Sequence, residues 1–125
     1  MLQLNLCLGW IWITGGFISG ALIGMFFYDS DWLGGYSTWR RRMVRLGHIS
    51  FLGTGLLNLA FVFTFTSGRE GTAPLLASWL FAVGAVTMPA VCFLSGWRDG
   101  FRRLFVIPVA SLIGAGASLI FQGLL

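Results

Sequence analysis

Hydrophobic residues fill four long runs of this chain, and polar residues gather in the short segments between them. The runs cover about residues 4–27, 47–66, 74–95 and 105–125, each near the roughly 20 residues that a helix needs to cross a ~30 Å hydrocarbon core. Unsatisfied backbone amides are costly in lipid, and four segments are too few strands for a closed barrel. The pattern therefore predicts an all-α polytopic membrane protein with four transmembrane helices in a bundle.

The second helix is expected to begin before its apolar run. Gly34 and Gly35 interrupt the chain, and Ser37 or Thr38 can then accept backbone N–H bonds as the N-cap, so this helix should cover 39–66. The first run lacks a basic leading region and is longer than an ordinary signal-peptide core, so we expect it to stay as a helix. Residues 1–125 are thus predicted to form a single transmembrane domain.

Composition and charge add an orientation to this fold. Of the 125 residues, 57% are hydrophobic and 10% are charged, with a net charge of +4 and a mean hydropathy of +0.85. The middle connection offers only Arg69, beside Glu70, while every other basic residue lies in the first or third connection. The positive-inside rule then predicts that these two connections are cytoplasmic and that both termini are periplasmic, in a bacterial inner membrane.

The arginines of the first and third connections are predicted to contact anionic lipid headgroups, and nucleic acid is not an expected partner. This set comprises Arg40, Arg41, Arg42, Arg45, Arg98, Arg102 and Arg103. Asp29 and Asp31 can pair with nearby arginines, although exposed ion pairs contribute little energy. Segments 39–46 (WRRRMVRL) and 97–104 (WRDGFRRL) share Trp, Arg, Arg and Leu at equal spacing, which either a duplicated hairpin or common interface chemistry would explain.

Three glycines of the first run predict a close helix contact. Gly16, Gly20 and Gly24 follow one another at four-residue spacing, which aligns them on one helix face as a small-xxx-small groove. The expected partner is the second or fourth helix of the same chain. The alternative is another subunit, including a second copy of this chain.

His48 and Asn58 are the two polar residues of most interest in the second helix. Asn58 lies near mid-membrane, where its amide should bond to a neighbouring helix. His48, the single histidine, lies about one turn inside the cytoplasmic boundary. Its imidazole could donate one structural hydrogen bond, which we favour, or it could ligate a haem or a (bacterio)chlorophyll. In the third helix, Pro89 is expected to produce an ordinary kink.

Catalytic chemistry has few residues to use in this sequence. No charged residue lies in the middle of a predicted span, which disfavours a proton-coupled transporter, and no metal-site motif is present. Cys7 and Cys92 are expected at opposite membrane faces, so a disulfide and a metal site are both unexpected. The chain is therefore not expected to be an enzyme.

Two classes of function fit these features. The first is a small non-catalytic subunit of a larger bacterial energy-transducing complex, respiratory or photosynthetic, that acts in assembly and lateral packing with other membrane subunits. The second is a self-assembling carrier or channel, or a porphyrin-binding subunit that uses His48. The glycine face, the six Trp and twelve Phe residues and the lack of catalytic groups favour the first class.

Overall fold

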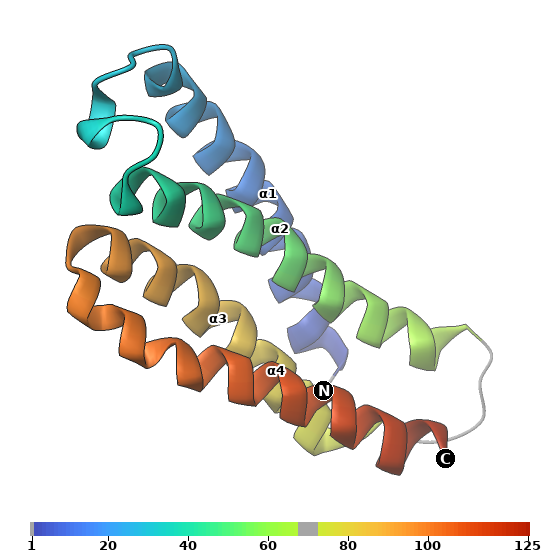
Figure 1. Cartoon of the computed structure of the whole chain (residues 1–125). Helices are drawn as coiled ribbons and strands as arrows, with labels where there is room; N and C mark the ends of the chain where they lie inside the picture. Colours follow the sequence, from blue (N-terminus) through green and yellow to red (C-terminus); the bar gives the residue numbers. More distant parts are fainter. Residues whose placement is uncertain (1, 68–72) are drawn as a thin grey trace.

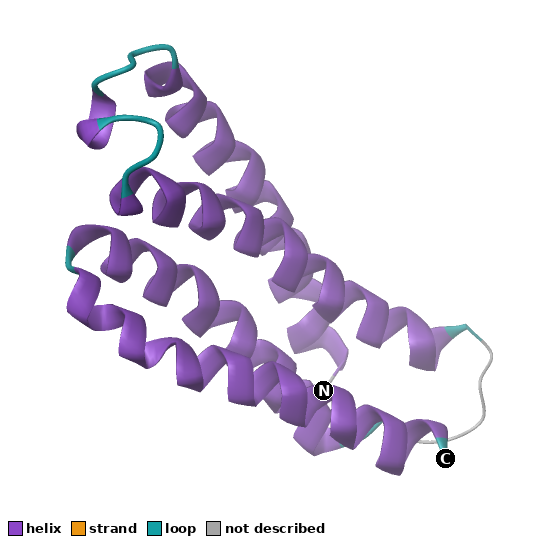
Figure 2. Ribbon diagram, in the orientation of Figure 1, coloured by secondary structure: helices purple, strands orange, loops and turns teal. Residues whose placement is uncertain are grey.

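The computed structural model of this chain describes residues 2–67 and 73–125. Within these ranges the ordered elements are all helices, joined by short loops and turns (Figure 2). Four helical segments are long and apolar enough to cross a membrane, which confirms the predicted all-α class with four such helices. Arg69 and Glu70, which enter the charge comparison between connections, lie outside the described residues.

The first three helices begin and end close to the boundaries of the apolar runs. α1 spans Leu2–Phe27, α2 spans Trp39–Thr66 and α3 spans Leu75–Trp97. α2 begins where the sequence predicts because Thr38 caps it: the extended Thr38 places its Oγ1 3.4 Å from the backbone N–H of Arg41, which donates to it. The expected N-cap at Ser37 or Thr38 is thus Thr38.

The fourth apolar run is less regular than the other three. It starts with the 3₁₀ helix η2 (Asp99–Phe105), continues as α4 (Val106–Ser118) and ends in the π-helix η3 (Leu119–Leu124). Together these pieces form a helical segment that begins six residues before the predicted residue 105, because η2 carries the chain from α3 into the next helix. Pro108 lies in the first turn of α4, where a missing amide hydrogen costs least.

Neighbouring helices run antiparallel, and their contacts follow chain order. α1 packs on α2, α2 on α3 and α3 on α4, with a smaller contact between α1 and α3. The α1–α2 loop and the α3–α4 turn lie at one end of the molecule, and the N- and C-termini lie at the other (Figure 1). α2 and α3 are therefore the inner helices, and α1 and the last segment are the outer ones.

The apolar core lies among α2, α3 and α4, nearer the end that holds the termini. It is centred on Phe61 of α2, Ala77 and Phe81 of α3, and Ala115 of α4, all at most 6% exposed. Gly84 of α3 adds a close approach, because Leu112 of α4 fills the space that a side chain there would take. Small residues on α3 thus let α4 pack directly on its backbone.

α3 continues through Pro89 as one helix. The ring removes the amide hydrogen that would bond to the carbonyl of Ala85. That carbonyl instead accepts a hydrogen bond from the indole Nε1 of Trp12 on α1, at 2.5 Å. The proline therefore creates a contact between α1 and α3 and does not open the helix.

Candidate functional site

A polar cluster in the α1–α2 loop is centred on Arg41. The guanidinium Nη2 donates to the carbonyl of Phe27 at 2.7 Å, and Nη1 donates to that of Asp29 at 2.9 Å and Trp32 at 3.3 Å. The last carbonyls of a helix lack intrahelical partners and attract positive charge. Arg41 therefore caps the C-terminal end of α1 from the first turn of α2.

Aromatic rings surround the same guanidinium. Its central carbon lies 4.4 Å from the ring centre of Phe27, 5.5 Å from that of Trp32 and 3.9 Å from that of Tyr36. Such cation–π contacts strengthen when water is excluded, and Arg41 is 0% exposed. The loop thus encloses a buried cation.

This position differs from the lipid-headgroup role predicted for Arg41. A side chain without solvent exposure offers no guanidinium surface to a phosphate, and the carbonyls of Phe27 and of the α1–α2 loop already accept hydrogen bonds from its terminal nitrogens. Within the described residues no ion pair joins Asp29 or Asp31 to an arginine, and the carbonyl of Asp29, not its carboxylate, contacts Arg41.

The other arginines of the predicted headgroup set are exposed at the same end of the molecule. They are Arg40, Arg42 and Arg45 on α2 and Arg98, Arg102 and Arg103 around η2. Two of them lie over indoles: Arg98 is 4.8 Å from the ring centre of Trp97, and Arg42 is 6.0 Å from that of Trp39. Their contact with lipid headgroups stays a prediction.

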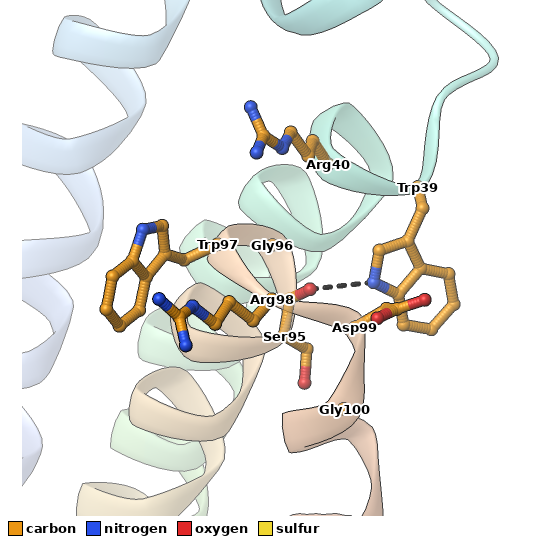
Figure 3. A pocket seen from close by; sticks show the side chains of 8 residues that line it. All are labelled: Trp39, Arg40, Ser95, Gly96, Trp97, Arg98, Asp99 and Gly100. Atoms are coloured by element: carbon orange, nitrogen blue, oxygen red, sulfur yellow. Dashed lines mark hydrogen bonds between the residues drawn. The ribbon is translucent and has the colours of Figure 1, made fainter.

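A cleft of about 590 Å³ separates the start of α2 from the turn between α3 and η2. Figure 3 shows it bordered by Arg40 and Trp39 on one side and by the segment from Ser95 to Gly100 on the other. The indole Nε1 of Trp39 donates to the Ser95 carbonyl at 2.7 Å and ties the two sides together. An open cleft with arginines and indoles can hold an anionic group.

The two similar segments, 39–46 and 97–104, meet at this cleft but occupy different helix positions. Trp39 is the first residue of α2, whereas Trp97 is the last residue of α3 and a 3₁₀ helix follows it. The matching residues are therefore equally spaced in the two segments, but they do not occupy equivalent positions in the two helical hairpins. Shared interface chemistry accounts for the likeness without a duplication.

Asn58 is the centre of a buried network that joins three helices. Its Oδ1 accepts from Asn5 Nδ2 of α1 at 2.7 Å, and its Nδ2 donates to the carbonyls of Thr54 at 2.9 Å and Phe81 of α3 at 3.2 Å. Asn5 also donates to the Ser78 carbonyl at 3.1 Å and accepts from the Ser78 hydroxyl. Asn5 and Asn58 are 0% exposed, so this network is an interhelical clamp.

His48 lies at the contact between α2 and α1. Its Nδ1 is 3.2 Å from Ser19 Oγ, and its ring lies against Gly20, where an added Cβ would stand 2.5 Å from Cε1. The imidazole thus packs on the bare backbone of α1 and bonds to a neighbouring hydroxyl. Of the adjacent glycines, Gly47 is covered by Phe93, while a Cβ at Gly53 would meet nothing within 4 Å.

The predicted glycine face of α1 is used over part of its length. A Cβ at Gly16 would stand 2.6 Å from Leu52 of α2, and one at Gly20 would meet His48. Gly24 has no heavy atom within 4 Å of such a Cβ, so this glycine does not contribute to the close packing. Gly9 extends the contact toward the other end, against Leu59 and Gly55 of α2. Close packing of α1 on α2 therefore runs from Gly9 to Gly20.

Cofactor chemistry finds limited support in the described residues. No group of three or more His, Cys, Asp or Glu side chains there could hold a metal ion. Cys7 is exposed, Cys92 is buried, and both are free. His48 is the remaining candidate ligand for a porphyrin, and its contacts with Ser19 and Gly20 are those of a packing residue.

Comparison of the chain with protein-family models, with curated proteins and with solved structures gives no match. The placement and chemistry of its own residues are therefore what its function can be inferred from.

The structural roles of three of the residues described above, Asn5, Trp12 and Arg41, were not predicted from the sequence. Asn5 is a polar residue inside an apolar run, which is a usable signal, because such a side chain in a membrane helix seeks a partner. Trp12 resembles the other tryptophans, and Arg41 stands among three other arginines. Only the packing of α1 on its neighbours distinguishes Trp12 from the other tryptophans and Arg41 from the other arginines.

Proposed function

We propose that this chain is a small non-catalytic subunit of a larger bacterial membrane complex, of the respiratory or photosynthetic class, in which it acts in assembly and lateral packing. In this proposal its four helices cross the inner membrane with the Arg41 loop and η2 on the cytoplasmic side. The observation that supports this proposal is that the outer helices are much less buried within the chain than the inner ones. Only 11% and 17% of the apolar windows of α1 and the last segment are buried within the chain, against 39% and 50% in α2 and α3.

The outer helices carry large apolar side chains on the surfaces that the chain leaves open. On α1 these include Trp10, Ile11, Phe17 and Met25, all more than half exposed, and on the last segment they include Val106, Ile113 and Phe121. Contiguous apolar surface of this size marks either lipid contact or contact with other proteins. Aromatic side chains of varied shape are well suited to packing against other membrane helices.

The buried polar groups support a non-catalytic role. Asn5, Asn58 and Ser78 satisfy one another and nearby carbonyls, and His48 bonds to Ser19. Catalysis needs polar groups that are available to a substrate. Here these groups hold α1, α2 and α3 together, which is the function of a scaffold.

Site-specific photo-crosslinking in the organism from which the sequence comes tests this proposal. A crosslinking residue at Phe17 of α1 (69% exposed) or Ile113 of α4 (68% exposed) should capture subunits of one respiratory or photosynthetic complex, identified by mass spectrometry. The same residue at the buried Phe61 (1% exposed) is the matched control and should react only within the chain. A stable homodimer that copurifies with no other protein would refute the proposal.

A further inference from the structure

An apolar groove of about 550 Å³ lies between α2 and the beginning of the last helical segment. The α2 side of the groove is formed by Leu46, Ile49, Gly53 and Leu57, while Met88 of α3 and Phe105 of η2 close it. A Cβ at Gly53 would meet nothing within 4 Å, so the groove is open at its middle.

The floor of this groove also offers no free polar group. Ser50 and Thr54 line it, and both are buried. Their hydroxyls donate within α2, to the Gly47 carbonyl at 2.7 Å and the Ser50 carbonyl at 2.5 Å. A guest of this groove therefore needs no hydrogen-bonding groups along its length, as is true of a hydrocarbon chain.

The length of the groove distinguishes a lipid chain from a protein helix. From Leu46 to Leu57 the α2 axis rises about 16 Å at ~1.5 Å per residue. That is close to the thickness of one leaflet, about half of the ~30 Å hydrocarbon core, whereas a transmembrane helix needs the whole of it. An acyl chain of the leaflet at the arginine-rich end matches this length.

Three exposed arginines each lie about one helical turn before a residue that lines the groove. Arg42 precedes Leu46 by four residues and Arg45 precedes Ile49 by four, which places each pair on one side of α2. Arg102 precedes Phe105 by three residues in the 3₁₀ helix η2, where side chains three apart eclipse. The mouth is therefore positively charged where the groove opens toward the membrane surface.

We propose that this groove binds one acyl chain of an anionic glycerophospholipid, whose phosphate lies among Arg42, Arg45 and Arg102. The inference rests on the proposed membrane location and is independent of any partner complex. Guanidinium groups bind phosphate oxygens through charge-assisted hydrogen bonds. Phosphatidylcholine carries the same phosphate and chains, but its choline cation cancels the net charge and is repelled by the arginines. Binding should thus favour phosphatidylglycerol over phosphatidylcholine.

Native mass spectrometry of the full chain released from vesicles tests this site. The vesicles contain equal amounts of phosphatidylglycerol and phosphatidylcholine, and the expected wild-type result is retained phosphatidylglycerol. Gly53→Leu fills the groove and should abolish retention. Gly116→Leu is the matched control, because a Cβ at that glycine of α4 also meets nothing within 4 Å, and it should retain the lipid.

Charge variants test the mouth separately. Arg42→Gln and Arg102→Gln should each lower phosphatidylglycerol retention by about fivefold, as expected for one basic residue near an anionic surface. Arg102→Lys is the control, because it keeps the positive charge at the same η2 position, and it should lower retention much less than Arg102→Gln.

Three results would overturn the lipid site. One is unchanged retention in Gly53→Leu, and another is equal retention of both lipids by the wild type. The third is a protein dimer that Gly53→Leu dissociates and the arginine variants do not, because a helix of a second copy would then occupy the groove. If the wild type does not retain phosphatidylglycerol while Phe17 and Ile113 still crosslink to subunits, the lipid site is refuted and the proposed function is not. A chain that does not insert into vesicles refutes both proposals.

Discussion

The indole N–H of Trp12 on α1 bonds to the carbonyl oxygen of Ala85 on α3, at a nitrogen–oxygen distance of 2.5 Å. Pro89, one turn further along α3, cannot supply the amide that this carbonyl would otherwise bind. A side chain of one helix thus replaces a backbone bond that another helix has lost. The two residues are 73 positions apart, so the bond also fixes how α1 lies on α3.

Trp12→Phe should destabilise the chain, because it leaves the Ala85 carbonyl without a donor. The expected cost is about 1 to 2 kcal/mol in thermal unfolding in detergent. Pro89→Ala restores an amide in α3, so Trp12→Phe should cost less in that background. Trp10→Phe, at a residue 55% exposed, is the control and should have little effect. Equal costs of Trp12→Phe with and without Pro89 would show that the indole hydrogen bond is unimportant.

Asn58→Leu should loosen the contacts of α2 with both α1 and α3. It removes the acceptor of Asn5 and the donor to Phe81 while leaving their polar atoms buried, for an expected loss of about 1 to 3 kcal/mol. Thr64→Val is the control, because the Thr64 hydroxyl bonds only to Ala60 of its own helix. If Asn58→Leu and Thr64→Val gave the same unfolding curve, Asn58 would not be an interhelical clamp.

Gly20→Leu and Gly24→Leu form a matched pair on one face of α1. At Gly20 the new side chain meets the His48 ring, and overpacking of this kind typically costs ~1 to 3 kcal/mol. At Gly24 it meets nothing within 4 Å and should be tolerated. Thermal stability in detergent measures both. Unchanged stability of Gly20→Leu would mean that α1 does not pack on α2 through this glycine.

His48→Gln should preserve both assembly and the absorption spectrum of the purified protein. Glutamine keeps a hydrogen-bonding group within reach of Ser19, which is the contact that His48 makes. A haem or (bacterio)chlorophyll ligand would lose its coordinating nitrogen instead. Selective loss of an absorption band in His48→Gln, with assembly intact, would make this chain a pigment-binding subunit. Arg45→Gln, which should affect insertion without changing a band, is the control.

Orientation is tested by cysteine labelling in intact cells after Cys7 and Cys92 have been replaced. A cysteine at Ser67, just after α2, should react with an impermeant thiol reagent added outside, and one at Ser37 in the Arg41 loop should not. The physical reason is the excess of arginine at the Ser37 end. Gly71, a second position expected to react, lies outside the described residues. The opposite labelling pattern would reverse the proposed topology.

The helices of this fold could be predicted from sequence because hydropathy and capping are local properties. The start of α2 at Trp39 follows from Thr38, and its end at Thr66 follows from the end of the apolar run. The extension of the last segment back to Asp99 could not be predicted, because a short 3₁₀ turn rich in charge leaves no apolar periodicity.

The interior contacts depend on helix rotation, which the sequence does not give directly. Asn58 was predicted to bond across helices, but its partner Asn5 is identified only when α1 is placed on α2. Arg40, Arg41 and Arg42 have the same chemistry, yet only the middle one is buried, because it is the one whose position on α2 faces the end of α1. Gly24 shares the spacing of Gly20, but a Cβ there would meet no heavy atom of α2 within 4 Å.

The cap formed by Arg41 has a consequence for the order in which the chain assembles. Every carbonyl and ring that binds its guanidinium lies before residue 41 and within 14 positions of it. By contrast, the bonds of Asn58 and Trp12 to Phe81 and Ala85 require α3. We therefore expect α1 and α2 to form a stable hairpin during synthesis, before α3 has been made. α3 should then pack against the surface that this hairpin presents.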